Sequence, residues 1–505
     1  MSGPHGRGGP QGGGAPPLGR GILRLALALA VAYVGLGLGL SYWQVVQAPS
    51  LASDPGNPLV MAAAREAPRG EILDARGVVL AKDVRATDGS RRRTYPQPLA
   101  APFLGYQSPI FGTAGLERAF DAQLSGLVPP SPLDALLGKF RDRPYVPSDV
   151  VTSIDMRLQR EAMRLLGSQR GAVVAMDPTT GRILALASSP TFDPARIVDP
   201  DRGRAYLASL RSQTAAAPLL DRATEGRYVP GSVFKIVTSI AGLGSGAITP
   251  ATTYPDQPAE ERSGFLVDGF RVTDGHHLFT GSTALDYSQA LQVSCNIWFA
   301  HAGLAIGAAD LRDWARRLGF EAPIPFDLPA AASQVTGGGG PDDGFQDEVE
   351  LANAAYGQAE TLVTPLQMAL VASTVADGGV LMKPQLVTEV RPAEGTADLR
   401  APETWRRVLD PSTATVIREA MVQAVSSDWG RRFAGPAQVP GVPTAGKSGT
   451  AQLGSGEPHS WFIGFAPADA PRIAVAVVIE RAGEGSGAAV PLGGKLMAYD
   501  LGLDR

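Results

Sequence analysis

Residues 171–187 read GAVVAMDPTTGRILALA, and this stretch gives the strongest indication of the fold class. Its two apolar runs, at 171–177 and 182–187, flank the residues Pro-Thr-Thr-Gly at 178–181. Proline and glycine favour chain reversal between apolar runs. The stretch therefore predicts a β-hairpin.

Two further apolar runs, at 460–466 and 472–479, predict a second pair of adjacent strands near the C-terminus. Long helical patterns, such as 364–374 and 412–425, lie between the two strand pairs, and an amphipathic pattern at 157–166 precedes the first. Strands at both ends with helices between them predict an α+β fold whose sheet is closed by distant parts of the chain.

Composition limits the function before any motif is considered. A chain of 505 residues is expected to hold two or three domains, and a net charge of −4 gives no support for nucleic-acid binding. The single cysteine, Cys295, excludes an intrachain disulfide, and no Cys/His cluster with metal-ligand spacing occurs, so no metal is expected. Only six of the 45 basic residues are lysines, so each lysine is more informative than usual. Lysine, unlike arginine, can lose its proton when it is buried.

The first chemical motif is Ser232-Val-Phe-Lys235, which directly follows Tyr228-Val-Pro-Gly231. The Pro-Gly pair predicts a helix start at Ser232, and residues three apart share a helix face, so Lys235 is expected beside the serine. A serine hydroxyl needs a base to become nucleophilic, and a neutral buried lysine can serve as that base. In isolation so short a pattern is better explained as a helix-capping serine followed by a solvated lysine.

The second motif is Ser294-Cys-Asn296, which follows a helical stretch. A hydroxyl and an amide two positions apart can reach one site from a turn. In isolation this motif is better explained as a polar loop.

The third motif is Lys447-Ser-Gly-Thr450. Gly449 lets a ligand approach the backbone closely, Ser448 and Thr450 offer hydroxyls, and Lys447 offers positive charge. Residues 441–448 also match a phosphate-binding loop by letter. That loop needs a buried strand before it and a helix after it, and neither is predicted here, so we do not expect nucleotide binding.

Together, in this order, the three motifs resemble the serine–lysine, serine–asparagine and lysine–glycine set of penicillin-binding proteins and class A β-lactamases. Further stretches resemble the monofunctional, class B penicillin-binding proteins, namely 69–81, 115–126, 151–155, 220–235, 357–369 and 461–467. The second motif reads SCN and the third KSG, and Asp193-Pro-Ala replaces the family's Asp-Pro-Asn. The resemblance implies a transpeptidase domain like that of serine β-lactamases, with an antiparallel sheet flanked by helices, and no cofactor.

The resemblance also implies a reaction, the D,D-transpeptidation that cross-links peptidoglycan stem peptides and that β-lactams inhibit covalently. Ser232 would attack the carbonyl of the D-Ala-D-Ala bond, and Lys235 would accept the serine proton. Ser294 would relay that proton to the leaving D-alanine, while Lys447 would hold the local electrostatic field.

The same resemblance implies the substrate contacts. Asn296 would bind the peptide backbone and help to position Lys235. Ser448 and Thr450 would bind the terminal carboxylate beside Gly449, and the N–H groups of Ser232 and Thr450 would form the oxyanion hole.

The chain before the strands divides into three parts. Residues 1–20 are rich in glycine and proline and are interpreted as a disordered cytoplasmic tail. Residues 21–46 contain a 22-residue apolar stretch, and at ~1.5 Å per residue this can cross a ~30 Å hydrocarbon core. Residues 47–150 resemble the family's pedestal, a dimerisation-type module, and 151–505 form the transpeptidase domain.

Arginines lie only before the apolar stretch, at Arg7, Arg20 and Arg24, so we expect a cytoplasmic N-terminus and an extracytoplasmic catalytic domain. A cleaved signal peptide is the alternative, although its apolar region is usually only ~7–15 residues long. A single-pass anchor in the cytoplasmic membrane is therefore predicted.

The resemblance implies partners as well, because residues 47–150 leave little room for a glycan polymerase. These partners are a glycosyltransferase of the SEDS class and other proteins of cell-wall synthesis or division. Two other functions stay open at this point: a β-lactamase or carboxypeptidase that releases the acyl group to water, and a non-catalytic β-lactam sensor that keeps the pocket.

Overall fold

The computed structural model describes residues 18–47, 68–86, 89, 91–126, 147–274, 280, 283–392 and 396–503. The chain divides into two compact units, Met1–Glu66 and Ala67–Arg505. The tail predicted for residues 1–20 lies outside the described residues up to position 17, and residues 18–20 form the first turn of a helix.

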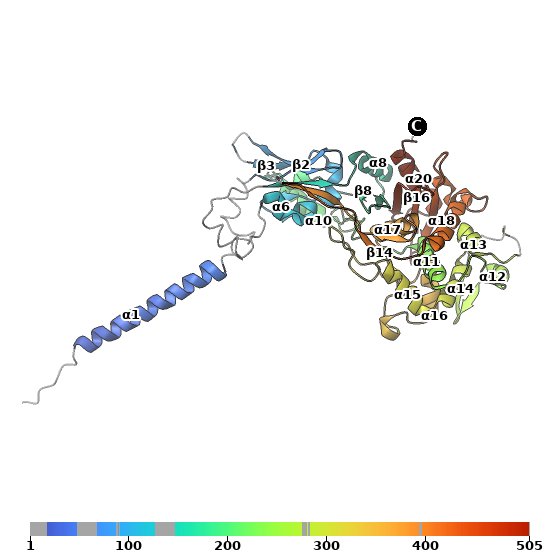
Figure 1. The fold of residues 1–505 in the computed structure, drawn as a ribbon, viewed down its shortest axis with the longest axis horizontal. Helices are drawn as coiled ribbons and strands as arrows, with labels where there is room; N and C mark the ends of the chain where they lie inside the picture. Colours follow the sequence, from blue (N-terminus) through green and yellow to red (C-terminus); the bar gives the residue numbers. More distant parts are fainter. Residues whose placement is uncertain are drawn as a thin grey trace, which may run out of the picture. The chain divides into compact units, whose positions relative to one another are not determined.

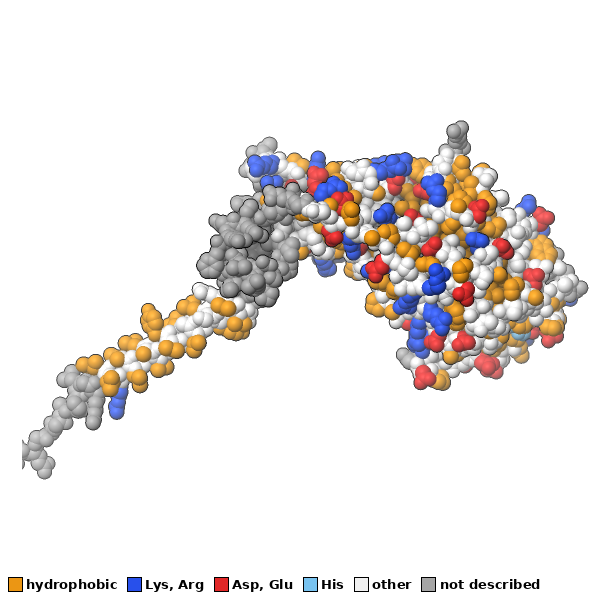
Figure 2. Space-filling model, in the orientation of Figure 1, with side chains coloured by type: hydrophobic (Ala, Val, Ile, Leu, Met, Phe, Trp, Pro, Cys, Tyr) orange, Lys and Arg blue, Asp and Glu red, His pale blue; other side chains and the backbone are white. Residues whose placement is uncertain are grey.

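The described residues of the first unit form one long apolar helix. Helix α1 spans Leu18–Ser41 and continues as a π-helical turn over Tyr42–Val46. Figure 2 shows hydrophobic side chains along this helix, and its side chains from Gly21 to Val46 are exposed. It is the one helix among the described residues that is long and apolar enough to cross a membrane, with a mean hydropathy of 2.0.

The second unit is built around a five-stranded antiparallel sheet (Figure 1). Its strand order is β15-β16-β17-β7-β8. The bounds are β7 Gly171–Met176, β8 Ile183–Ser189, β15 Ala445–Ala451, β16 His459–Ala466 and β17 Ile473–Ile479. The predicted hairpin is confirmed as β7–β8, and the predicted C-terminal pair as β16–β17. Because β17 also pairs with β7, distant parts of the chain close this sheet as expected.

Helices cover both faces of the five-stranded sheet, and its central strands β7 and β17 are therefore apolar at every position. Helices α8 (Met156–Leu166) and α20 (Ala489–Asp500) pack on one face, and α17 (Pro365–Ala376) packs on the other (Figure 1). Successive residues of a strand point to opposite faces. Val173 and Ala175 accordingly join the core beneath α8 and α20, whereas Ala172 and Val174 join the core beneath α17.

Further helices of this unit precede and follow α17 along the chain. They are α9 Pro194–Ile197, α10 Gly203–Ser212, α11 Lys235–Ser245, α12 Gln257–Ser263, α13 Tyr287–Val293, α14 Asn296–Ile306, α15 Ala308–Arg317, α16 Glu348–Ala355, α18 Pro411–Ser426 and α19 Arg431–Ala434. A small hairpin, β9 Phe265–Val267 with β10 Phe270–Val272, and a two-stranded sheet, β11 Val380–Met382 with β14 Thr404–Arg407, accompany them.

A second sheet, of six strands, draws on two distant parts of the sequence. Its order is β13-β12-β6-β1-β2-β3. The bounds are β1 Ile72–Leu73, β2 Val79–Arg85, β3 Arg91–Thr94, β6 Ser148–Thr152, β12 Val387–Pro392 and β13 Asp398–Leu399. Short elements pack beside it, namely α4 Ala101–Leu104, β4 Gln107–Ser108, β5 Gly112–Thr113, α5 Gly115–Ala119 and α6 Asp121–Ser125. Strand β12 pairs antiparallel with β6, so the predicted pedestal region and the later chain share one sheet.

A buried ion network lies beside this second sheet. Glu117 of α5 is fully buried, and its carboxylate accepts hydrogen bonds from Arg69 at 2.8 Å and from Arg93 at 2.6 Å. Arg93 also donates to the carbonyl of Gly70 at 2.8 Å, and Tyr95 donates its hydroxyl proton to Glu117 at 3.3 Å. Burial alone raises a carboxyl pKa, but the two guanidinium groups reverse this and lower the pKa of Glu117 below its usual value.

Candidate active site

The first motif starts a helix, as predicted. A 3₁₀ turn over Gly231–Phe234 runs directly into α11, so Ser232 is half-buried at the helix start and Lys235 is fully buried. Gly231 has a positive φ of 57°, and a Cβ there would lie 2.5 Å from the carbonyl oxygen of Thr450. Its N–H donates to the carbonyl of Gly357 at 2.8 Å. A glycine is therefore required where the serine segment approaches the sheet.

The second motif occupies the tight turn between α13 and α14. Ser294 adopts the left-handed conformation, with φ 61° and ψ 38°, at the end of α13. Such a conformation is uncommon for a residue other than glycine and is typical of functional turns. Cys295 caps α14 by accepting the Trp298 N–H on its sulfur, and Asn296 is the first residue of that helix. The turn thus aims the side chains of Ser294 and Asn296 toward the first motif.

The third motif lies on β15, the edge strand of the five-stranded sheet. A Cβ on Gly449 would lie 3.0 Å from the carbonyl oxygen of Pro230, so glycine allows the serine segment to pack on this strand. The hydroxyl of Thr450 accepts a hydrogen bond from the N–H of Gly485 at 3.2 Å. Lys447 and Ser448 lie within the strand, which confirms that residues 441–448 do not form a strand-to-helix phosphate loop.

The three motifs meet at one hydroxyl group. Lys447 Nζ donates to Ser294 Oγ at 2.8 Å, and Lys235 Nζ lies 3.3 Å from the same oxygen. Lys235 Nζ also donates to Asn296 Oδ1 at 2.8 Å and to the carbonyl oxygen of Ser294. Ser294 therefore connects two lysines that are separated by more than two hundred residues of sequence.

Burial makes both lysines easy to deprotonate. Burial lowers the pKa of Lys235 to about 8, although the nearby Asp274 carboxylate opposes this shift. Burial also lowers the pKa of Lys447 well below its usual value, and the positive charge of Lys235 adds to the effect. An ammonium group out of water next to a second ammonium group favours its neutral form. Near neutral pH this site can therefore both accept and donate a proton.

The structure brings all eight predicted site residues together, but Lys235 contacts the second motif. Among the described residues, Lys235 Nζ donates to Ser294 and Asn296, and no hydrogen bond joins it to Ser232. The sequence placed Lys235 beside Ser232 from helical spacing alone. The family resemblance implied that Asn296 helps to position Lys235, whereas the contacts of Lys235 with Ser294 were not indicated by the sequence.

Sequence spacing also gave no indication of a group of potential metal ligands that includes Cys295 of the second motif. The ligand atoms of Glu261, Asp274 and Cys295 all lie within 4.8 Å of one another. A thiolate with two carboxylates suits a borderline cation such as Zn²⁺. In this structure the Cys295 thiol instead donates to Glu261 at 3.2 Å, and Asp274 accepts the Ile297 N–H at 3.1 Å. Burial raises the pKa of the thiol, so these contacts hold the turn with Cys295 protonated.

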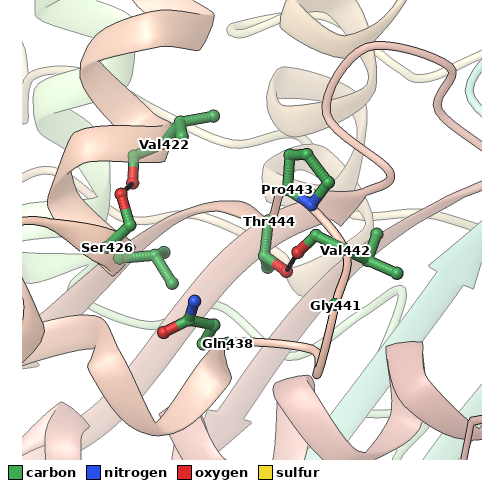
Figure 3. Close-up of a pocket in the computed structure, with 8 residues that line it drawn as sticks. Val422, Ser426, Gln438, Gly441, Val442, Pro443 and Thr444 are labelled. Atoms are coloured by element: carbon green, nitrogen blue, oxygen red, sulfur yellow. Dashed lines mark hydrogen bonds between the residues drawn. The ribbon is translucent and has the colours of Figure 1, made fainter.

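A cavity lies at the start of β15, away from the converging side chains. The cavity has a volume of about 290 Å³ and lies between the end of α18 and residues 438–444 (Figure 3). Its wall hydroxyls are used within the chain, since Ser426 donates to the carbonyl of Val422 and Thr444 to that of Val442. None of the eight predicted site residues lines it, so the site is defined by the shared hydroxyl of Ser294 and not by this cavity.

Comparison with known proteins covers most of the chain. Residues 171–498 match the penicillin binding protein transpeptidase domain, and residues 69–144 match the penicillin binding protein A dimerisation domain. The peptidoglycan D,D-transpeptidase PbpA of Mycolicibacterium smegmatis is 34% identical over 486 residues, which cover 91% of this chain and 94% of that protein. The protein of the same name from Mycobacterium tuberculosis is 35% identical over 477 residues, covering 89% and 92% respectively.

Solved structures agree with the sequence comparison. The ceftriaxone acyl-enzyme complex of penicillin-binding protein A from M. tuberculosis superimposes with a TM-score of 0.75 at 31% identity. The match covers 87% of this chain and all of that one. The fold thus has a counterpart in a protein whose structure is known as a ceftriaxone acyl-enzyme complex.

Proposed function

The chain belongs to the penicillin-binding protein transpeptidases, and we propose that Ser232 is the nucleophile of its reaction. The protein is a serine-type peptidoglycan D,D-transpeptidase, and β-lactams inhibit it by forming acyl-enzymes. The assignment of residues rests on the hydroxyl group of Ser294. Its oxygen accepts a hydrogen bond from Lys447 Nζ at 2.8 Å and lies 3.3 Å from Lys235 Nζ.

In the acylation step Ser232 Oγ attacks the carbonyl carbon of the penultimate D-alanine, and the neutral amine of Lys235 takes the hydroxyl proton. The C–N bond to the terminal D-alanine then breaks. Ser294 passes a proton to the leaving amine, which departs as free D-alanine. A burial-lowered pKa of about 8 keeps a useful fraction of Lys235 neutral for this role.

In the second step the amine of another stem peptide attacks the ester, and the serine oxygen leaves with a proton. Asn296 holds Lys235 and binds the donor backbone, while Ser448 and Thr450 bind the terminal carboxylate beside Gly449. The N–H groups of Ser232 and Thr450 stabilise the oxyanion, and loss of such a donor typically costs about 3–4 kcal/mol in other enzymes.

The test is covalent labelling of the intact protein with a fluorescent penicillin. We expect one added penicillin mass on the peptide that contains Ser232, and no label on Ser232→Ala at equal folded concentration. After excess drug is removed, the label should persist for many minutes. Label on another residue would overturn the nucleophile, and release within seconds would favour a β-lactamase.

We also propose that residues 21–46 anchor the protein in the cytoplasmic membrane with residues 151–505 on the outer side and residues 47–150 as the pedestal between. The support is the apolar helix together with Arg24 at its start and no later basic residue within it. Protease treatment of spheroplasts should remove the catalytic domain. A protected catalytic domain would contradict this topology.

A glycosyltransferase of the SEDS class is the partner we propose, together with other proteins of cell-wall synthesis or division. The support is family membership and the match of residues 69–144 to a dimerisation domain. Co-purification from detergent with such a glycosyltransferase tests the proposal, and a matched chain lacking residues 68–126 is the control.

A further inference from the structure

The segment that leads into Ser232 is tied to the sheet by residues outside the three motifs. Tyr228 is buried, and its backbone exchanges two hydrogen bonds with Val363, at 2.9 and 2.8 Å. Its hydroxyl donates to Glu480 Oε1 at 3.0 Å. Glu480 directly follows β17, so a strand end in the middle of the sheet reaches the residue four positions before Ser232.

Glu480 is held from two sides. Arg222, which is 2% exposed, donates from Nε to the same Oε1 at 2.7 Å, and Arg170 lies 3.3 Å from Oε2. The other guanidinium nitrogens of Arg222 donate to the carbonyls of Ala216 and Ala217. Because the guanidinium group of Arg222 is bonded to two backbone carbonyls, it holds the Glu480 carboxylate in a fixed position. This carboxylate accepts the hydrogen bond from the Tyr228 hydroxyl.

The ring of Tyr228 is fixed as well. It lies edge-on to His459 and Trp461, with ring centroids 5.4 and 6.1 Å away. A Cβ on Gly226 would lie only 2.7 Å from the ring, so glycine at that position admits it. Trp461 in turn donates its indole N–H to the carbonyl of Val229 at 3.0 Å. Burial raises the pKa of Tyr228, so its hydroxyl stays protonated and keeps donating.

The position of Ser232 depends on this segment. Gly231, next to the serine, lies against the carbonyl of Thr450 on β15, and the oxyanion site proposed above needs the N–H groups of Ser232 and Thr450 at a fixed separation. A misplacement of about 1 Å can cost on the order of 100-fold in rate. We propose that Glu480 is a positioning residue for acylation, acting through Tyr228 and Arg222; this inference rests on the proposed role of Ser232.

The experiment measures the acylation rate constant and the dissociation constant for a fluorescent penicillin separately, by stopped flow over a range of drug concentrations. Glu480→Ala should lower the rate constant at least about tenfold and leave the dissociation constant within about twofold. Glu480→Gln keeps the acceptor oxygen and should recover part of the loss. Tyr228→Phe removes only the hydroxyl and should show the same pattern at smaller size, about threefold to tenfold.

Glu321 provides a matched control. Its carboxylate also pairs with two arginines, Arg312 and Arg316, and its side chain is 14% exposed, the same as that of Glu480. Glu321→Gln should lower the melting temperature as much as Glu480→Gln does, with an unchanged acylation rate constant.

An unchanged rate constant in both Glu480→Ala and Tyr228→Phe would overturn the inference, as would an equal loss in Glu321→Gln. If Glu480→Ala does not fold, Tyr228→Phe decides alone, because the ring still fills its place. Failure of the proposed function would be seen separately, as wild-type protein that carries no label on Ser232.

Discussion

Two regions of this protein bury charged groups, and they do so in opposite ways. Beside the six-stranded sheet, Glu117 lies between Arg69 and Arg93, so each buried charge has an opposite partner within 2.8 Å. In the active site, Lys235 and Lys447 carry the same charge and share the hydroxyl of Ser294. The paired region lowers the pKa of its carboxyl group and keeps it ionised, whereas the like-charged region lowers the pKa of both lysines.

The choice of residue follows from this difference. Arginine stays charged in proteins and suits a permanent buried pair, while lysine can lose its proton when it is out of water. Nearly all basic residues of this chain are arginines, and two of its six lysines occupy the catalytic motifs. Burial therefore stabilises structure in one region and prepares proton transfer in the other.

The largest effect is expected when an arginine, the cation of the paired region, replaces the lysine base of the active site. Lys235→Arg keeps the charge but cannot supply a neutral base, so acylation by a fluorescent penicillin should fall by about 10²–10⁴-fold. Lys447→Arg should retain more activity, because its proposed role is electrostatic. Rates are compared at equal folded concentration, and equal losses in the two variants would contradict the separation of roles.

The converse change removes the anion from the paired region. Glu117→Gln removes the fully buried counter-charge that Arg69 and Arg93 share, leaves them only Asp121 and Asp83 as partners, and should destabilise the protein by about 3–5 kcal/mol. Urea unfolding measures the loss, and the acylation rate of the folded fraction should stay unchanged. Asp121→Asn is the control, since Asp121 also pairs with Arg69 but is half exposed and should cost far less.

The pH dependence of acylation distinguishes the two regions more finely. Lys235 is active when neutral, so the rate should rise with pH through a midpoint of about 8. The charged and titratable groups around it are Lys447, Asp274, Cys295 and Glu261. Asp274 raises the pKa of Lys235, so removing its charge lowers that pKa.

Asp274→Asn should therefore move the midpoint of the acylation profile to lower pH, and the relative rate at pH 7 should increase. The asparagine can still accept the Ile297 N–H, so the turn is expected to keep its shape. A midpoint that stays at the wild-type pH, or one that moves to higher pH, would show that Lys235 is not the titrating base.

The smallest effect is expected at a charge pair that belongs to neither region. Lys383 and Glu403 lie 2.9 Å apart, and their side chains are 37% and 66% exposed. Glu403→Gln should change the free energy of unfolding by no more than about 1 kcal/mol and leave acylation unchanged. A larger loss of unfolding free energy, measured in urea, would mean that an exposed charge pair contributes as much as a buried one. This would contradict our comparison of the two regions.

Much of the chemistry was predictable because it lies on local elements. Ser232 with Lys235, Ser294 with Asn296, and the run from Lys447 are short patterns whose spacing survives folding. The strand pairs β7–β8 and β16–β17 followed from turn residues and apolar runs in the same way.

The rest depends on contacts that no local pattern records. Asp274 and Glu261 precede the second motif in polar sequence, and only packing brings them beside Cys295. Glu480 ends an apolar run and reads like any solvent-facing carboxylate, although its side chain is largely buried. Strand β12 joins β6 by long-range pairing, which is chosen by tertiary packing.

That last pairing has a consequence for the order of events during synthesis. The hydroxyl of Thr388, on β12, donates a hydrogen bond to the carbonyl of Val151, on β6, and these residues are 237 positions apart in the sequence. At about 5–20 residues per second, the open edge of β6 waits roughly 10–50 s for its partner strand to be made. An exposed strand edge invites pairing with other chains. The interval between these two strands is thus when a nascent chain most needs a chaperone, and a slow codon run between them would lengthen the exposure.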